Sequence, residues 1–81
     1  MFVVYLLRSR NFPEKVYVGL TTDLHRRLDQ HNGGAEKGYA AKYAPWNVIV
    51  AIQFENRARA EAFERYLKSG SGHSFAKRHF W

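Results

Sequence analysis

Hydrophobic residues gather near the amino terminus in two short runs that are rich in β-branched and aromatic side chains. The runs cover residues 2–7 and 16–20, and a turn-like stretch at 10–15 separates them. This pattern predicts a β-hairpin. Because side chains alternate between the two faces of a sheet, a suitable register would bring Tyr5 and Tyr17 together on one face.

The pattern then changes to a helical one over residues 24–31. Residues 21–23 offer Thr and Asp side chains that can cap the helix, and glycines follow its end. At about 100° per residue, His31 falls on the apolar side with Arg27 at its edge, whereas Arg26 points to the opposite side. We therefore expect Arg27 and His31 to face inward together.

The middle of the chain is less regular and leads into a third apolar run. Residues 36–43 are compatible with a short helix, which Ala44-Pro45 would end. Residues 47–54 are β-branched and largely apolar, as expected of a central strand covered on both faces.

A second helical pattern covers residues 57–68, and the Ser/Gly stretch 69–72 is expected to end it. Glu64 lies about 40° from Ala60 on the buried side of this helix. A carboxylate at the border of an apolar face needs a partner. Residues 73–81 are compatible with a last short helix that packs its aromatic rings on the sheet.

These elements predict an α/β fold in which a small three-stranded, mainly antiparallel sheet is flanked by helices. Eighty-one residues are enough for one domain, so 1–81 is expected to be a single unit. No stretch has the length of a membrane span, and the expected location is the cytoplasm.

Charge and composition narrow the classes of partner. Lys and Arg number 13 against 7 acidic residues, which gives a formal charge of +6. Such a surface attracts nucleic acid, although an excess of basic residues can also have no role beyond keeping the protein soluble. The absence of cysteine excludes disulfides, thiolate zinc sites and a cysteine nucleophile.

Several polar residues recur in a spacing that resembles a known family. Tyr5 ends Val3-Val4-Tyr5, Tyr17 begins Tyr17-Val18-Gly19, Arg27 and His31 lie on the next helix, and Glu64 follows on a later one. Over nearly the whole chain, this order resembles the GIY-YIG nucleases. Val3 stands where the family's first motif has glycine, Val18 replaces isoleucine, and Ala40 lies where relatives often carry threonine.

The resemblance implies a metal-dependent DNA endonuclease whose active site contains Tyr5, Tyr17, Arg27, His31 and Glu64. Glu64 would hold one Mg²⁺ or Mn²⁺, because hard cations prefer carboxylate oxygen. Arg27 would contact a phosphate oxygen. Tyr5, Tyr17 and His31 remain alternatives for the general base. Gly19 is the structural member of the motif, and we expect it to let substrate or a helix approach its strand closely.

Two further points concern the partner. Cations interleaved with aromatic residues form either a nucleic-acid surface or a solvated rim: Lys37, Lys42, Lys68, Lys77 and Arg78. The leading function is a structure-specific endonuclease of DNA repair or recombination that acts on branched, nicked or flapped DNA. The alternatives are a nucleic-acid-binding module with little or no cleavage, and a protein-interaction domain.

Overall fold

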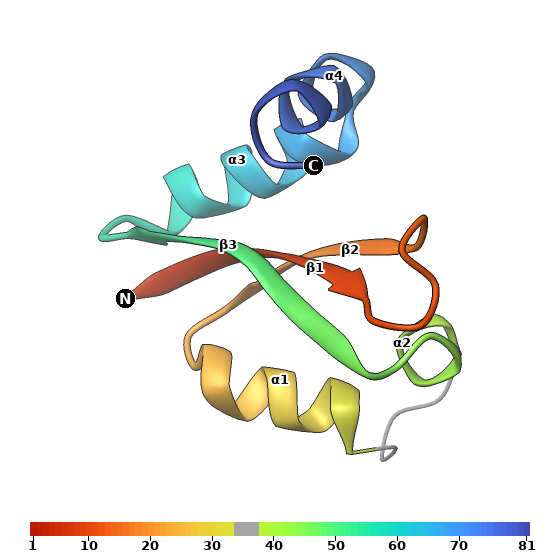
Figure 1. Ribbon diagram of the computed structural model, residues 1–81. Helices are drawn as coiled ribbons and strands as arrows, with labels where there is room; N and C mark the ends of the chain where they lie inside the picture. Colours follow the sequence, from red (N-terminus) through yellow and green to blue (C-terminus); the bar gives the residue numbers. More distant parts are fainter. Residues whose placement is uncertain (34–37) are drawn as a thin grey trace.

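The centre of the sheet is strand β1 (Phe2–Ser9), which has a neighbour on each side. The sheet order is β2-β1-β3, and both β2 (Val16–Thr21) and β3 (Trp46–Phe54) run antiparallel to β1. The predicted hairpin and the mainly antiparallel three-stranded sheet are therefore confirmed. The computed structural model describes residues 1–33 and 38–81, and in Figure 1 helices lie on both sides of this sheet.

The prediction that residues 47–54 form a central strand is wrong, because β3 pairs only with β1 and lies at the edge. Its side chains alternate between half-buried and exposed over much of its length, and Val48 is 37% exposed. The buried central strand is β1, in which every residue of 3–7 is buried. An apolar run indicates that a strand is covered, but the order of strands depends on pairings that the run does not encode.

One face of the sheet is covered by α1 (Leu24–Asn32) and the short helix α2 (Tyr39–Lys42). The helix α1 begins as predicted, since the Asp23 carboxylate accepts a hydrogen bond of 3.1 Å from the Arg26 backbone N–H. The helix predicted at 36–43 is shorter, and the first part of that prediction lies outside the described residues.

The other face is covered by α3 (Arg57–Lys68) and α4 (Gly70–His79), as Figure 1 shows. Residues 69–72 were expected only to end a helix, but Ser69 alone separates the two helices, and its hydroxyl accepts the Gly72 N–H. A Cβ built at Gly72 would lie 1.6 Å from the Tyr66 carbonyl oxygen. Glycine here permits close packing of α4 on α3. With Ser69 as its cap, the last helix starts earlier than predicted.

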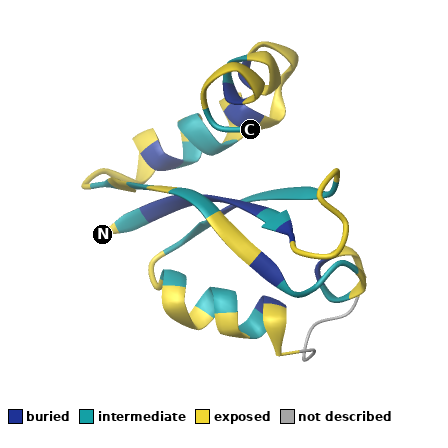
Figure 2. Cartoon of the chain, viewed as in Figure 1, coloured by how far each residue is buried: buried dark blue, intermediate teal, exposed yellow. Residues whose placement is uncertain are grey.

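Burial follows these layers. Figure 2 shows the buried residues concentrated in β1 and on the helix sides that face the sheet. Two clusters form the core, one around Val4 and Leu6 under α3 and α4, and one around Tyr5, Leu7 and Trp46 under α1 and α2. In the described part of the chain, no helix has the length and apolarity needed to cross a membrane.

Candidate active site

The Tyr5 ring lies across the neighbouring strand at Gly19. The two residues are directly opposite each other in the β1–β2 pairing. A Cβ built at Gly19 would lie 2.3 Å from the Tyr5 hydroxyl oxygen and 2.4 Å from Cζ. The close approach expected at Gly19 is therefore made by the Tyr5 phenol, and neither a substrate nor a helix was needed to explain this glycine.

Tyr5, Tyr17 and His31 form one cluster under α1, as the predicted register and helix face required. The Tyr5 and Tyr17 rings stack at 6.2 Å with an interplanar angle of 17°. The Tyr5 hydroxyl and His31 Nε2 are 3.2 Å apart, and the Tyr17 and His31 rings are 4.8 Å apart. Tyr5 and His31 are buried, whereas Tyr17 is half-buried, so Tyr17 is the more accessible of the two phenols.

Two aromatic residues that the sequence did not assign to the site complete the surroundings of Tyr17. Its ring lies 6.0 Å from Trp46 and 6.5 Å from Tyr39. Trp46 is fixed by a 2.8 Å hydrogen bond from its indole N–H to the carbonyl of Ala40. The interleaving of Tyr39 and Trp46 with lysines was the available signal, but it did not indicate contact with Tyr17.

Arg27 lies one turn before His31 on α1 and is half-buried, while Arg26 is exposed, as predicted. Arg27 lines two small pockets of about 230 and 260 Å³ at the end of β2, and both pockets also contain Thr21 and Thr22. A guanidinium at this place presents a permanent charge and several fixed donors to the solvent side of β2.

Glu64 is carried by α3, on the opposite face of the sheet from α1. Its carboxylate accepts a 3.0 Å hydrogen bond from Lys68 Nζ, and its side chain is 22% exposed. This bond confirms the expected need for a partner. A single carboxylate of this kind can bind a hard metal ion, with water molecules as the remaining ligands. Within residues 1–33 and 38–81, no group of three or more metal-ligating side chains is present.

The side of α3 that carries Glu64 runs along the outer edge of β2. Arg57, Glu61, Glu64 and Lys68 are spaced by four, three and four residues and share one side of the helix, where Arg57 bonds Glu61 at 3.1 Å. Arg57 lines the 260 Å³ pocket with Arg27, and Lys68 lines a groove with Val16 and Val18 of β2. Glu64 and Arg27 therefore flank the same strand from its two faces.

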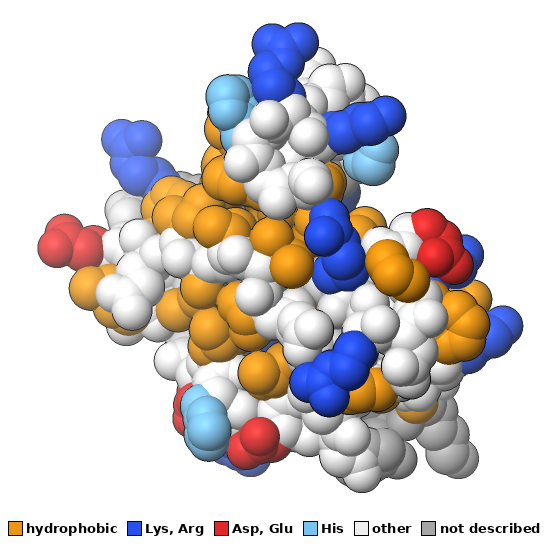
Figure 3. Space-filling view, in the orientation of Figure 1, with side chains coloured by type: hydrophobic (Ala, Val, Ile, Leu, Met, Phe, Trp, Pro, Cys, Tyr) orange, Lys and Arg blue, Asp and Glu red, His pale blue; other side chains and the backbone are white. Residues whose placement is uncertain are grey.

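The predicted nucleic-acid surface is divided by the sheet. Lys42 lies on α2, and its Nζ is 5.4 Å from the Tyr43 ring centroid. Lys68, Lys77 and Arg78 lie on α3 and α4, on the other side, and Lys37 is outside the described residues. Figure 3 likewise shows Lys and Arg side chains spread over this view without a single patch. The four of these cations that the structure describes do not form one continuous surface.

Comparisons with known proteins agree with this arrangement. The model of the GIY-YIG catalytic domain matches residues 1–78. A structure-specific endonuclease subunit SLX1 from Candida dubliniensis is 37% identical, over 94% of this chain and 27% of the relative. The corresponding subunit from Talaromyces marneffei is 41% identical, over 78% of this chain and 18% of the relative. This chain thus spans about a quarter or less of these relatives.

A solved structure gives the same result for the fold. The solution NMR structure of a UPF0213 protein, BH0048 from Bacillus halodurans, superimposes with a TM-score of 0.56 and is 26% identical. The match covers 95% of this chain and 81% of that protein. The similarity therefore extends over the sheet and the helices on both of its faces.

Proposed function

This chain belongs to the GIY-YIG catalytic domain family, and on that basis we propose that it is a metal-dependent endonuclease that hydrolyses DNA phosphodiester bonds. The observation that carries the proposal is the Tyr5 phenol, which lies across Gly19 and contacts His31 Nε2 at 3.2 Å. Residues from two strands and one helix thereby form one cluster of polar side chains beside β2, an edge strand of the sheet.

Arg27 compensates charge on the phosphate in this proposal. Phosphodiester hydrolysis places additional negative charge on the phosphoryl oxygens in the transition state. The half-buried guanidinium lines both pockets at the end of β2, where it can donate to a phosphate from the solvent side. The scissile phosphate would accordingly lie along the outer edge of β2, between Arg27 and Glu64.

Tyr17 orients the attacking water, and Tyr5 and His31 act as a supporting pair. Tyr17 is half-buried, whereas Tyr5 and His31 are 2% and 1% exposed. Stacking on Tyr5 at 6.2 Å and contact with His31 at 4.8 Å fix the Tyr17 ring. The contact of 3.2 Å between the Tyr5 hydroxyl and His31 Nε2 also offers a route by which a proton can be passed away from the water.

Glu64 would hold one Mg²⁺ or Mn²⁺, with waters as the remaining ligands. The ion, when bound, supplies positive charge for the departing 3′ oxygen. Lys68 Nζ lies 3.0 Å from Oε2 of this carboxylate, so the ammonium would compete with a metal ion for that oxygen. Lys68 thus holds the carboxylate at the β2 edge.

The proposed class of DNA substrate rests on the names of the relatives. The names of the fungal relatives describe structure-specific endonuclease subunits. We infer that this chain likewise acts on branched, nicked or flapped DNA, as an activity of DNA repair or recombination.

Nicking of supercoiled plasmid and of branched and flapped oligonucleotides, with Mg²⁺ or Mn²⁺, tests the nuclease. Glu64→Ala and Arg27→Ala are each expected to lower the cleavage rate on the order of 100-fold. Glu61→Ala is the matched control, because it removes a carboxylate of the same helix that is also paired four residues away. Equal traces of cleavage in all variants would indicate a binding module instead.

A further inference from the structure

A groove of about 500 Å³ separates the start of β2 from the corner between α3 and α4. It is about twice as large as either pocket that Arg27 lines. Its size lies within the range of roughly 300–1,000 Å³ that is usual for small-molecule sites. Its lining comes from three elements: Val16, Val18, Leu67, Lys68, Ser69, Gly70 and His73.

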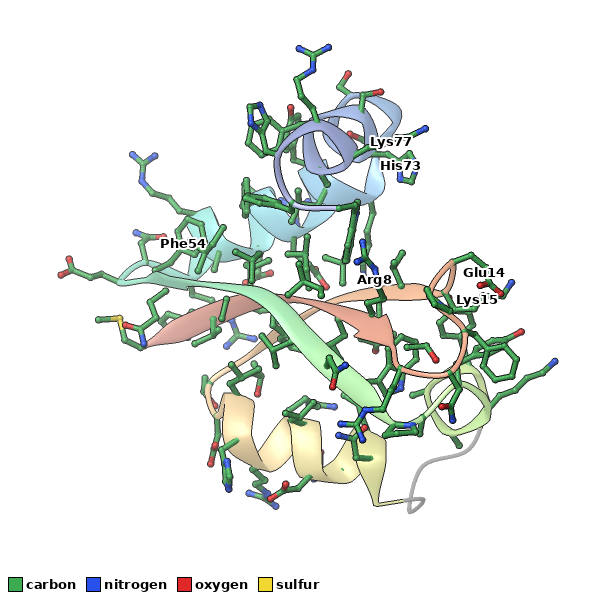
Figure 4. All side chains as sticks on the ribbon, viewed as in Figure 1. Arg8, Glu14, Lys15, Phe54, His73 and Lys77 are labelled. Atoms are coloured by element: carbon green, nitrogen blue, oxygen red, sulfur yellow. The ribbon has the colours of Figure 1, made fainter. Side chains whose placement is uncertain are left out.

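The groove combines an apolar floor with basic side chains. Val16, Val18 and Leu67 supply the floor, and Lys68 and His73 supply the polar rim. None of the described residues that line the groove is acidic. In Figure 4, Lys77 projects from the same side of α4 as His73, above the start of β2. An inorganic anion needs no apolar floor, and an apolar ligand needs no cations. A nucleotide uses both, through its base and its phosphate.

Lys68 links the groove to the proposed metal site. Lys68 lines the groove and also donates to the Glu64 carboxylate at 3.0 Å. The neighbouring nucleotide of a DNA strand whose phosphate lies beside Glu64 is therefore within reach of the groove. A base in a duplex is stacked and paired, so only an unpaired base is available to an apolar floor.

We propose that this groove binds an unpaired nucleotide of the DNA strand next to the scissile phosphate. The proposal rests on the proposed nuclease function, and it names the feature of a branched substrate that this domain reads. Lys68, His73 and Lys77 contact the phosphates of that strand, while the base lies on Val16, Val18 and Leu67.

Gly70 offers a variant that tests the groove without disturbing the fold. A Cβ at Gly70 would have no atom within 4 Å, so a side chain there enters open space. Gly70 is the first residue of α4, where a carboxylate is favourable for helix stability. Gly70→Asp therefore adds a negative charge to the groove in a stable protein, and Gly70→Asn adds the same volume without the charge.

Binding is measured by fluorescence anisotropy with a labelled oligo(dT) single strand and a blunt duplex of equal length, without metal. Gly70→Asp is expected to weaken single-strand binding by about fivefold or more and duplex binding far less, because a nearby like charge repels the phosphate. Gly70→Asn should bind as wild type does. Equal weakening for both DNAs, unchanged binding by Gly70→Asp, or no single-strand binding by wild type would each overturn the groove proposal.

Cleavage of a flapped oligonucleotide by the same preparations separates the two proposals. If wild type fails to cleave but shows the expected binding differences, the groove stands and the nuclease fails. If wild type cleaves and all three proteins bind single strands alike, the nuclease stands and the groove fails.

Discussion

Gly19 allows the Tyr5 ring to lie over the backbone of β2, with its hydroxyl next to His31. The sequence predicted that both tyrosines would share a face, because alternation and the hairpin fix that face. It did not predict what approaches Gly19, since this depends on the pairing of Tyr5 with Gly19 and on the direction of the ring. The spacing of residues along the sequence does not reveal a role of glycine that depends on how two strands pair.

Gly19→Ala should displace the Tyr5 ring, since the added Cβ would lie 2.3 Å from its hydroxyl oxygen. Overpacking of a well-filled interior costs about 1–3 kcal/mol, and we expect that loss in the free energy of unfolding measured with urea. Cleavage should fall with it. Gly70→Ala is the control, because its Cβ meets no atom within 4 Å. Equal stability of the two variants would contradict the packing seen at Gly19.

Lys68→Met should tighten Mn²⁺ binding, because it removes the ammonium that competes for the Glu64 carboxylate at 3.0 Å. Stability should change little, since the Lys68 side chain is 54% exposed and ion pairs of surface residues four apart on a helix contribute roughly 0.3–0.5 kcal/mol. Calorimetric titration with Mn²⁺ measures the affinity. Arg57→Met removes the similar ion pair with Glu61 and should leave it unchanged. Tightening in neither variant would argue against Glu64 as the ligand.

At the scale of elements, α1 positions Arg27 and His31 because both of its ends are fixed. Asp23 caps its first turn at 3.1 Å. At its other end, the Asn32 side chain accepts a bond of 2.6 Å from the Trp46 N–H and donates one of 3.3 Å to the Trp46 carbonyl. The end of α1 is thereby joined to the start of β3, a contact between segments that are distant in sequence.

Asn32→Ala should lower the free energy of unfolding by about 1–3 kcal/mol, because it leaves two backbone groups of Trp46 without their partner. Thermal and urea denaturation measure the loss. Asn47→Ala provides the comparison, since the Asn47 side-chain oxygen accepts an exposed hydrogen bond of 3.1 Å from the Arg10 guanidinium. Its expected effect is within about 0.5 kcal/mol. A similar loss in both variants would show that Asn32 is not a specific connection.

The helices and strands were largely predictable from the sequence, but which of them lie next to each other was not. Periodicity identified the hairpin, the long helices and the inward side of α1, because these depend on local spacing. It placed the third strand in the centre, where β1 actually lies, and began α4 too late. Strand order is set by long-range pairing. The start of α4 is capped by Ser69, and its first turn packs closely at Gly72 against Tyr66.

At the scale of the whole molecule, the sheet places basic residues on opposite sides, although the net charge counts them together. A net charge of +6 predicted affinity for nucleic acid, but composition does not say which side a cation occupies. Lys42 belongs to the α2 side, and Lys77 belongs to the α4 side with the groove. Only the second side also carries Glu64, so we expect the DNA strand beside the proposed metal site to contact α4 more closely than α2.

Lys77→Gln should reduce the slope of log affinity against log salt by about one, because each lost phosphate contact releases about one counterion fewer. Lys42→Gln changes the net charge by the same amount on the other side of the sheet, and its slope should stay near that of wild type. Anisotropy titrations of a flapped DNA between low and moderate salt measure both slopes. Equal reductions would mean that DNA senses the total charge of the domain, whereas a reduction confined to Lys42→Gln would place the strand on the α2 side and away from Glu64.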